Sequence, residues 1–126
     1  MKITADWKDA EGKGLKDIGW ALEYEGTIES EEAIEIDIGH KWFKISGSLK
    51  SMFSISAGDG ISAGLSITCK KVLKWSMNLF AGTAVYKKPT EEESVVEARE
   101  LQGGEVKHGI VRLLPMESSE PVKETS

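Results

Sequence analysis

Hydrophobic and polar residues alternate along much of the chain, and this period of two is typical of β-strands. In residues 33–38, three isoleucines alternate with two acidic residues, which predicts a half-buried strand. Residues 41–49 continue the alternation through Phe43, Ile45 and Leu49. A tight turn at Gly39-His40 would pair the two segments as a hairpin.

A second hairpin is predicted around Gly58-Asp59-Gly60, because glycines permit the positive φ that tight turns require. The flanking segments are 53–57 and 61–69. One face of this hairpin would carry the odd-numbered apolar residues, from Phe53 to Cys69. The other face would carry only serine, threonine and glycine.

The apolar row continues beyond Cys69 and is too long for one strand, so a turn must fall near residues 70–74. Residues 75–86 are then expected to form a strand with a bulge at Gly82. Residues 14–25 fit either helical or strand spacing, and we favour strands because glycines weaken a helix.

The period changes after Pro89. Thr90 and Glu93 have the spacing of a capping box, which predicts an α-helix near residues 90–102. Residues 106–114 resemble a final strand. Residues 116–126 carry too little apolar surface to offset their ordering entropy, which predicts a disordered acidic tail.

These patterns predict a mainly β fold, an antiparallel sandwich or barrel of about six or seven strands with one α-helix. The chain of 126 residues fits a single β-rich domain over residues 1–115. No convincing repeat of 20 to 50 residues is found.

The net charge of −5 conceals a strongly basic centre. Residues 1–40 carry eleven acids and four lysines, whereas residues 41–88 carry eight lysines and one acid. We favour the interpretation that acidic and basic strands lie side by side, with Glu35 and Asp37 near the lysines at 41 and 44. The alternative is a basic patch for phosphates or an anionic surface. Its residues would be Lys41, Lys44, Lys50, Lys70, Lys71 and Lys74.

Candidate chemistry is sparse. Cys69 is the only cysteine, which excludes an internal disulfide, and its place on the apolar face predicts inert packing. The two histidines, His40 and His108, do not form a recognisable site with it. We therefore predict no catalytic, cofactor-binding or metal-binding residues, and a protein that is not an enzyme.

The uncharged hydroxyl face is the strongest functional signal, because exposed sheets usually carry charges that prevent association. We therefore expect an assembly or binding protein that forms homo-oligomers through this face. Its residues would be Ser46, Ser48, Ser54, Ser56, Ser62, Gly64, Ser66 and Thr68.

Three further functions are compatible with the sequence. The first is a β-barrel module that binds a small molecule. The second is a membrane-associating or pore-forming hairpin. The third is a single-stranded nucleic-acid binder that stacks bases on its aromatic residues, namely Trp42, Phe43, Trp75 or Tyr86. The start of the chain lacks the apolar region of a signal peptide, and no uncharged run approaches the roughly 18 residues of a spanning helix, which predicts a cytoplasmic protein.

Overall fold

The computed structural model describes residues 1–39, 41–76, 78–83, 88, 90 and 92–114. Short strands dominate these residues. In chain order the strands are β1 (Lys2–Ile3), β2 (Lys16–Asp17), β3 (Ala21–Tyr24), β4 (Ile28–Ser30), β5 (Ile34–Ile36), β6 (Trp42–Ile45), β7 (Leu49–Ser51), β8 (Ile55–Ala57), β9 (Ile61–Ala63), β10 (Ile67–Cys69), β11 (Val72–Lys74), β12 (Asn78–Phe80), β13 (Val95–Ala98), β14 (Glu100–Gln102), β15 (Glu105–His108) and β16 (Ile110–Leu113).

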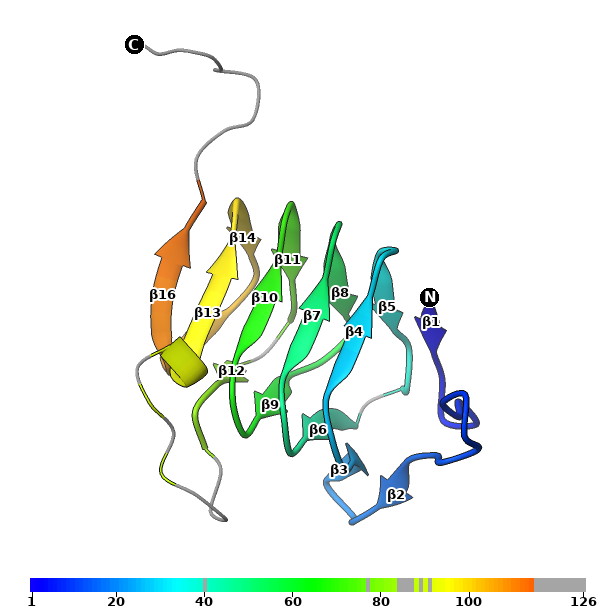
Figure 1. Ribbon diagram of the computed structural model, residues 1–126. Helices are drawn as coiled ribbons and strands as arrows, with labels where there is room; N and C mark the ends of the chain where they lie inside the picture. The colour runs from blue at the N-terminus through cyan, green and yellow to red at the C-terminus, as the bar shows by residue number, and fades with distance from the viewer. Residues whose placement is uncertain (40, 77, 84–87, 89, 91, 115–126) are drawn as a thin grey trace, which may run out of the picture.

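The strands form three sheets, and from β3 onward each sheet receives every third strand. Sheet I has the order β15-β12-β9-β6-β3-β2, sheet II the order β16-β13-β10-β7-β4, and sheet III the order β14-β11-β8-β5-β1. All pairings between these strands are parallel except that of β2 with β3. The chain therefore winds through sheets I, II and III in turn and rises by one strand per coil, which is a parallel β-solenoid (Figure 1).

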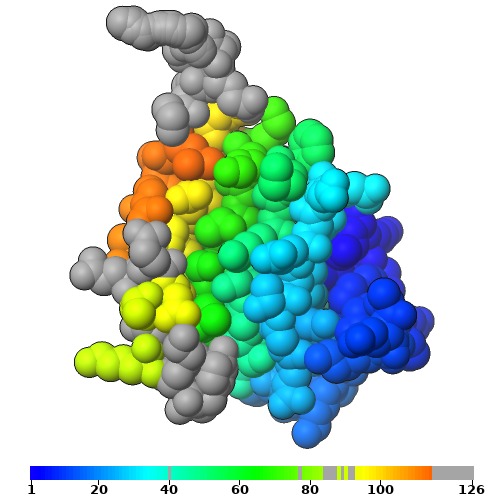
Figure 2. All heavy atoms as spheres, viewed as in Figure 1, coloured from blue at the N-terminus to red at the C-terminus, as the bar shows by residue number. Residues whose placement is uncertain are grey.

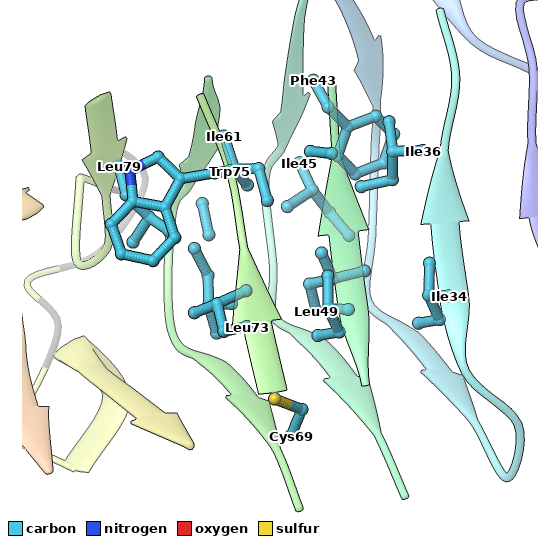
Figure 3. Packing of buried hydrophobic residues seen from close by; sticks show 14 of the residues in the cluster. Ile34, Ile36, Phe43, Ile45, Leu49, Ile61, Cys69, Leu73, Trp75 and Leu79 are labelled. Atoms are coloured by element: carbon cyan, nitrogen blue, oxygen red, sulfur yellow. The ribbon is translucent and has the colours of Figure 1, made fainter. Parts of the chain in front are cut away.

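Stacked apolar ladders fill the interior. In sheet I, Leu22 pairs with Phe43, which pairs with Ile61, which pairs with Leu79. Phe43, Ile61 and Leu79 are fully buried. Figure 3 shows these side chains packed with those of the other two sheets. Burying one such side chain contributes about 1.5–3 kcal/mol, so repetition of the ladder stabilises a fold built from strands of two to four residues.

The predicted antiparallel sandwich or barrel is wrong. The period of two correctly marked most of the residues that face inward, but it carries no information about which strand pairs with which. Apart from the pairing of β2 with β3, each strand pairs with a strand of the next coil rather than with its neighbour in sequence. Phe43, Ile61 and Leu79 follow one another at 18 residues, a spacing shorter than the repeats of 20 to 50 residues that we sought.

Both predicted hairpins are wrong for the same reason. Strands β8 and β9 flank Gly58-Asp59-Gly60 but belong to sheets III and I. The glycine at 60 has another role, because the Trp42 indole lies over it and an added Cβ would come within 2.5 Å of the ring. Strands β5 and β6 are likewise in different sheets, and His40 lies outside the described residues.

The predicted helix near residues 90–102 is also wrong. The capping box forms. The Thr90 amide donates a hydrogen bond to the Glu93 carboxylate at 3.1 Å, and the Glu93 amide donates one to the Thr90 hydroxyl at 3.2 Å. Only a 3-10 turn, Glu92–Ser94, follows it. The chain then enters β13 and β14, because Val96 and Ala98 stack on the ladder of sheet II and become fully buried there. Tertiary burial outweighs the local helix signal.

The remaining strand predictions are partly confirmed. Strands β2 and β3 form within residues 14–25, and the break between β10 and β11 falls at residues 70–71. The strand predicted over 75–86 is reduced to β12, and residues 84–87 lie outside the described residues. The final strand is split by Gly109, whose φ is +121°. The predicted tail at 116–126 lies outside the described residues.

Among the described residues, no helix has the length and apolar character needed to cross a membrane.

Candidate functional site

The eight residues predicted to form one uncharged face are spread around the solenoid. Ser56 lies on sheet III, Ser62 on sheet I and Thr68 on sheet II. The others lie at the corners between sheets: Ser46, Ser48, Gly64 and Ser66 between sheets I and II, and Ser54 between sheets II and III. No single face unites them, and their role in self-association stays a prediction.

Several of these serines bond within the chain. Ser48 and Ser66 are buried at the same corner of successive coils, with their hydroxyl oxygens 3.1 Å apart. The Ser54 hydroxyl accepts a hydrogen bond from the Val72 amide at 3.2 Å. These contacts hold one coil on the next, so small hydroxyl side chains at the corners have a structural role.

The lysines predicted to form a basic patch are also divided between sheets, and three of them form ion pairs with acids that lie closer to the first end of the solenoid. Lys44 pairs with Glu23 at 3.4 Å, and Lys50 pairs with Glu29 at 3.7 Å. Lys41 reaches Asp17 of β2 at 2.7 Å. Side-by-side acidic and basic strands are thereby confirmed, but the partners differ from those predicted. Asp37, which we expected near Lys41 and Lys44, lies 3.7 Å from Lys2 instead.

The other three predicted lysines lie in the coil formed by β9, β10 and β11. Lys70 and Lys71 form the turn between β10 and β11, and Lys74 ends β11 on the outside of sheet III. Lys70, Lys50 and Glu29 line a hollow of about 460 Å³ at the edge of sheet II. A carboxylate within this hollow makes it a poor match for phosphate.

Candidate catalytic groups do not converge. Cys69 is buried in the core, as predicted, and this burial raises the pKa of its thiol. His108 lies on β15 at the end of the solenoid, and its Nδ1 contacts the Ala81 carbonyl. Within the described part of the chain, no three His, Cys, Asp or Glu side chains are grouped so that they could hold a metal ion.

The first end of the solenoid is covered by residues 1–20. Strand β1 extends sheet III and β2 extends sheet I, while Trp7 and Leu15 pack against the core between them. The Trp7 and Tyr24 rings meet edge-to-face at 5.5 Å.

The Tyr24 hydroxyl donates a hydrogen bond to Asp9 at 2.8 Å, which ties the cap to β3. Burial, together with this hydrogen bond, raises the pKa of Tyr24 to about 12. The same hydrogen bond, with others from backbone amides, lowers the pKa of Asp9.

The last end of the solenoid is formed by β14, β15 and β16, and no described residue covers it. Val111 stacks on Val96 at the top of the inward ladder of sheet II, and Leu113 stacks on Ala98. Val111 and Leu113 are therefore 47% and 62% exposed, although Val96 and Ala98 beneath them are buried. Ile110 beside them is 42% exposed. Figure 2 shows the face of sheet II, with the strands in sequence order from β4 (cyan) to β16 (orange).

No described strand extends sheet II at its first end. Neither β1 nor β2 joins it, so β4 is its edge strand, as β16 is at the other end. The Leu114 amide donates a hydrogen bond to the Ala98 carbonyl at 2.8 Å, and the Ile28 amide donates one to the Ser48 carbonyl at 2.9 Å. Because alternate residues of a strand bond to the same neighbour, the backbone groups of Val111, Leu113 and Glu29 face outward at these edges. Such edges are templates for pairing with another strand.

A separate surface feature lies on the outside of sheet I. Trp20, Trp42 and Phe80 form a row whose ring centroids are 6.2 and 5.7 Å apart. Together with Ser62 they line an open groove of about 250 Å³. Lys44 lies 5.9 Å above the Trp20 ring. The groove offers flat aromatic surface for stacking.

Comparison with family models, with curated proteins and with solved structures gives no match. The functional interpretation therefore rests on the geometry described above.

Sequence reasoning missed the residues of the open edges. The alternation of Val111 and Leu113 with Arg112 predicted a strand, but it did not show that this strand lies at the end of a stack. The 18-residue spacing of the apolar rows was the signal that could have revealed the coils and hence their ends.

Proposed function

We propose that the protein is a non-catalytic assembly protein whose copies associate through the open end of the solenoid at β16. The single observation that carries this proposal is the exposed aliphatic pair of Val111 and Leu113 on β16, which is an edge strand among the described residues. Association would bury this row and satisfy the outward backbone groups, as in other cases of β-augmentation.

The proposal keeps the self-association predicted from the sequence but moves it to a different surface. The hydroxyl-rich residues are dispersed, and Ser48 and Ser66 already bond each other. The edge at β16 combines apolar side chains with backbone groups that no described strand pairs, a combination that the outer faces of the sheets lack.

Light scattering over a range of protein concentrations tests the proposal. The wild-type protein should show a mass above 13.8 kDa that rises with concentration. Val111→Asp or Leu113→Asp should return it to the monomer, because a carboxylate would be buried at the joint. The matched control is Phe53→Asp, since Phe53 is 48% exposed but lies at a corner in the middle of the solenoid. A wild-type monomer at all concentrations would overturn the proposal.

Pore formation and nucleic-acid binding receive less support from the geometry. A pore-forming stem requires a hairpin of β8 and β9, but these strands belong to different sheets. Of the aromatic residues expected to stack on bases, Phe43 and Trp75 are buried in the core, and Tyr86 lies outside the described residues.

A second candidate function is small-molecule binding, at the aromatic groove rather than inside a barrel. The row of Trp20, Trp42 and Phe80 supports it, because planar or ring-shaped ligands stack on such faces. Titration with nucleosides and simple sugars while tryptophan fluorescence is recorded tests this function. Binding should be lost in Phe80→Ala, and no fluorescence change with any of these probes would count against it.

A further inference from the structure

We infer that the joint is head-to-tail, with β16 of one copy pairing in parallel with β4 of the next, so that the copies form an open stack along the solenoid axis. This inference rests on the proposed self-association and specifies its partner, register and symmetry. A heterologous contact between opposite ends does not close unless the rotation returns to its start, so it generates filaments.

Backbone geometry supports the joint. Glu29 presents its outward amide and carbonyl at one edge, and Val111 and Leu113 present theirs at the other. Placing Glu29 of the next copy beside Arg112 would let its amide donate to the Val111 carbonyl and its carbonyl accept from the Leu113 amide. The same arrangement recurs at every parallel pairing within sheet II.

Side chains favour the same register. The outward ladder of sheet II reads Glu29, Lys50, Thr68, Glu97 and Arg112, with ion pairs at 3.7 Å between Glu29 and Lys50 and at 3.1 Å between Arg112 and Glu97. Continuing this ladder into a second copy sets Arg112 next to Glu29, which are opposite charges.

The inward ladder continues as well. Val111 would stack on Ile28 of the next copy, as Val96 stacks on Ile67 within the chain.

A symmetric joint is less favourable. Two β16 strands paired antiparallel by a two-fold axis must set inward residues opposite inward residues. The register that pairs Val111 with Leu113 of the other copy sets the two Arg112 side chains directly opposite each other, and like charges in that position are destabilising. Charge therefore favours the head-to-tail joint over this register of the two-fold joint.

The joint has different consequences for the strands of sheet III and sheet I. In sheet III no described residue adds a strand to the coil of β15 and β16, so β1 of the next copy would follow β14 as the next described strand. In sheet I, β15 and the next copy's β2 would occupy the same level. The shorter β2, with two exposed residues in antiparallel pairing, has to leave β3 when the joint forms, and the cap side chains Trp7 and Leu15 have to move with it.

Cysteine cross-linking of the full chain tests the register. Neighbouring strands lie about 4.8 Å apart, so a bifunctional methanethiosulfonate of about that reach should join residues 29 and 112 across the joint. The variant carrying both Glu29→Cys and Arg112→Cys should give a ladder of covalent dimers, trimers and higher species. Within one chain the two positions are separated by three intervening strands, so they cannot be joined internally.

Three controls give each outcome a meaning. Arg112→Cys alone should stay uncross-linked, and a covalent dimer would instead show the two-fold joint. Lys50→Cys combined with Arg112→Cys should not form a ladder, because Lys50 lies one strand further from the joint. The wild-type protein controls for Cys69, which is buried.

Charge reversal gives a second test. Arg112→Glu should raise the midpoint concentration of assembly about tenfold or more, since the substituted carboxylate would face Glu29 of the next copy. Lys74→Glu makes the same charge change in the middle of the solenoid and should leave the midpoint unchanged. A multimer without the cross-linked ladder would overturn this register while leaving self-association standing, whereas a wild-type monomer would overturn both.

Discussion

The two ends of the solenoid differ in how the apolar interior of the terminal coil is covered. A stack of coils has an apolar interior, and its terminal coils have no neighbour to cover them. At the first end, Trp7 and Leu15 pack against the core, and β1 and β2 extend two sheets. At the last end, Val111 and Leu113 continue the inward ladders into an exposed edge. An uncovered interior ladder is therefore a place where a second chain can add.

The largest expected effect separates the middle of a ladder from its end. Leu49→Ala should lower the free energy of unfolding by about 2–5 kcal/mol, because Leu49 is fully buried between neighbouring coils. Val111→Ala on the same ladder should cost under about 1 kcal/mol in the monomer, since nearly half of its side chain already contacts solvent. Urea denaturation at low protein concentration measures both, and equal losses would contradict the assignment of an open end.

Removing the cap should make the first end resemble the last. Trp7→Ala should lower the free energy of unfolding by about 2 kcal/mol, because the indole is partly buried against the core and Tyr24. Hydrogen exchange should show faster opening of β1 and β3 than of β10. Uniform acceleration through all coils would mean that the cap does not act locally.

A smaller effect concerns the bond that ties the cap to β3. Tyr24→Phe removes the hydrogen bond to Asp9 and should cost about 1 kcal/mol near neutral pH, as measured by urea denaturation.

The pH dependence of this loss follows from the two pKa shifts. A pKa raised to about 12 means that the contribution of Tyr24 is complete below about pH 10 and is lost as pH rises toward 12. The lowered pKa of Asp9 makes its contribution complete above its ordinary value near 3.8 and lost as pH falls through the folded value. The difference between wild type and variant should therefore shrink in both windows, and a constant difference would contradict this account.

The smallest effect concerns β2. Asp17 accepts hydrogen bonds from Lys41 at 2.7 Å and from the Gly19 amide at 2.9 Å, which hold β2 in place and lower the pKa of its carboxyl. If β2 must leave sheet I for copies to join, Asp17→Asn should lower the midpoint concentration of assembly by a small factor. Asp59→Asn makes the same charge change between β8 and β9, away from both ends, and serves as the control in light scattering.

Much of the interior could be predicted from the sequence, whereas the candidate interface could not. Alternation correctly placed Ile34, Ile36, Phe43 and Ile45 inside, because the direction of a side chain along a strand depends only on its position in the strand. Phe53 shared the predicted row yet is exposed, since it lies in the corner between β7 and β8, where the alternation does not hold.

The amino-acid sequence by itself determined a β-rich chain and most of its inward-facing residues, because these follow from local alternation. The tertiary structure alone decided that the strands pair in parallel between coils, which acidic residue each paired lysine faces, and that Val111 stands at an edge while Val96, on the same ladder, is buried. The reason is that a strand's own pattern is the same wherever it lies in the stack. Whether it is covered depends on a neighbour that, in this fold, lies a whole coil away in the chain.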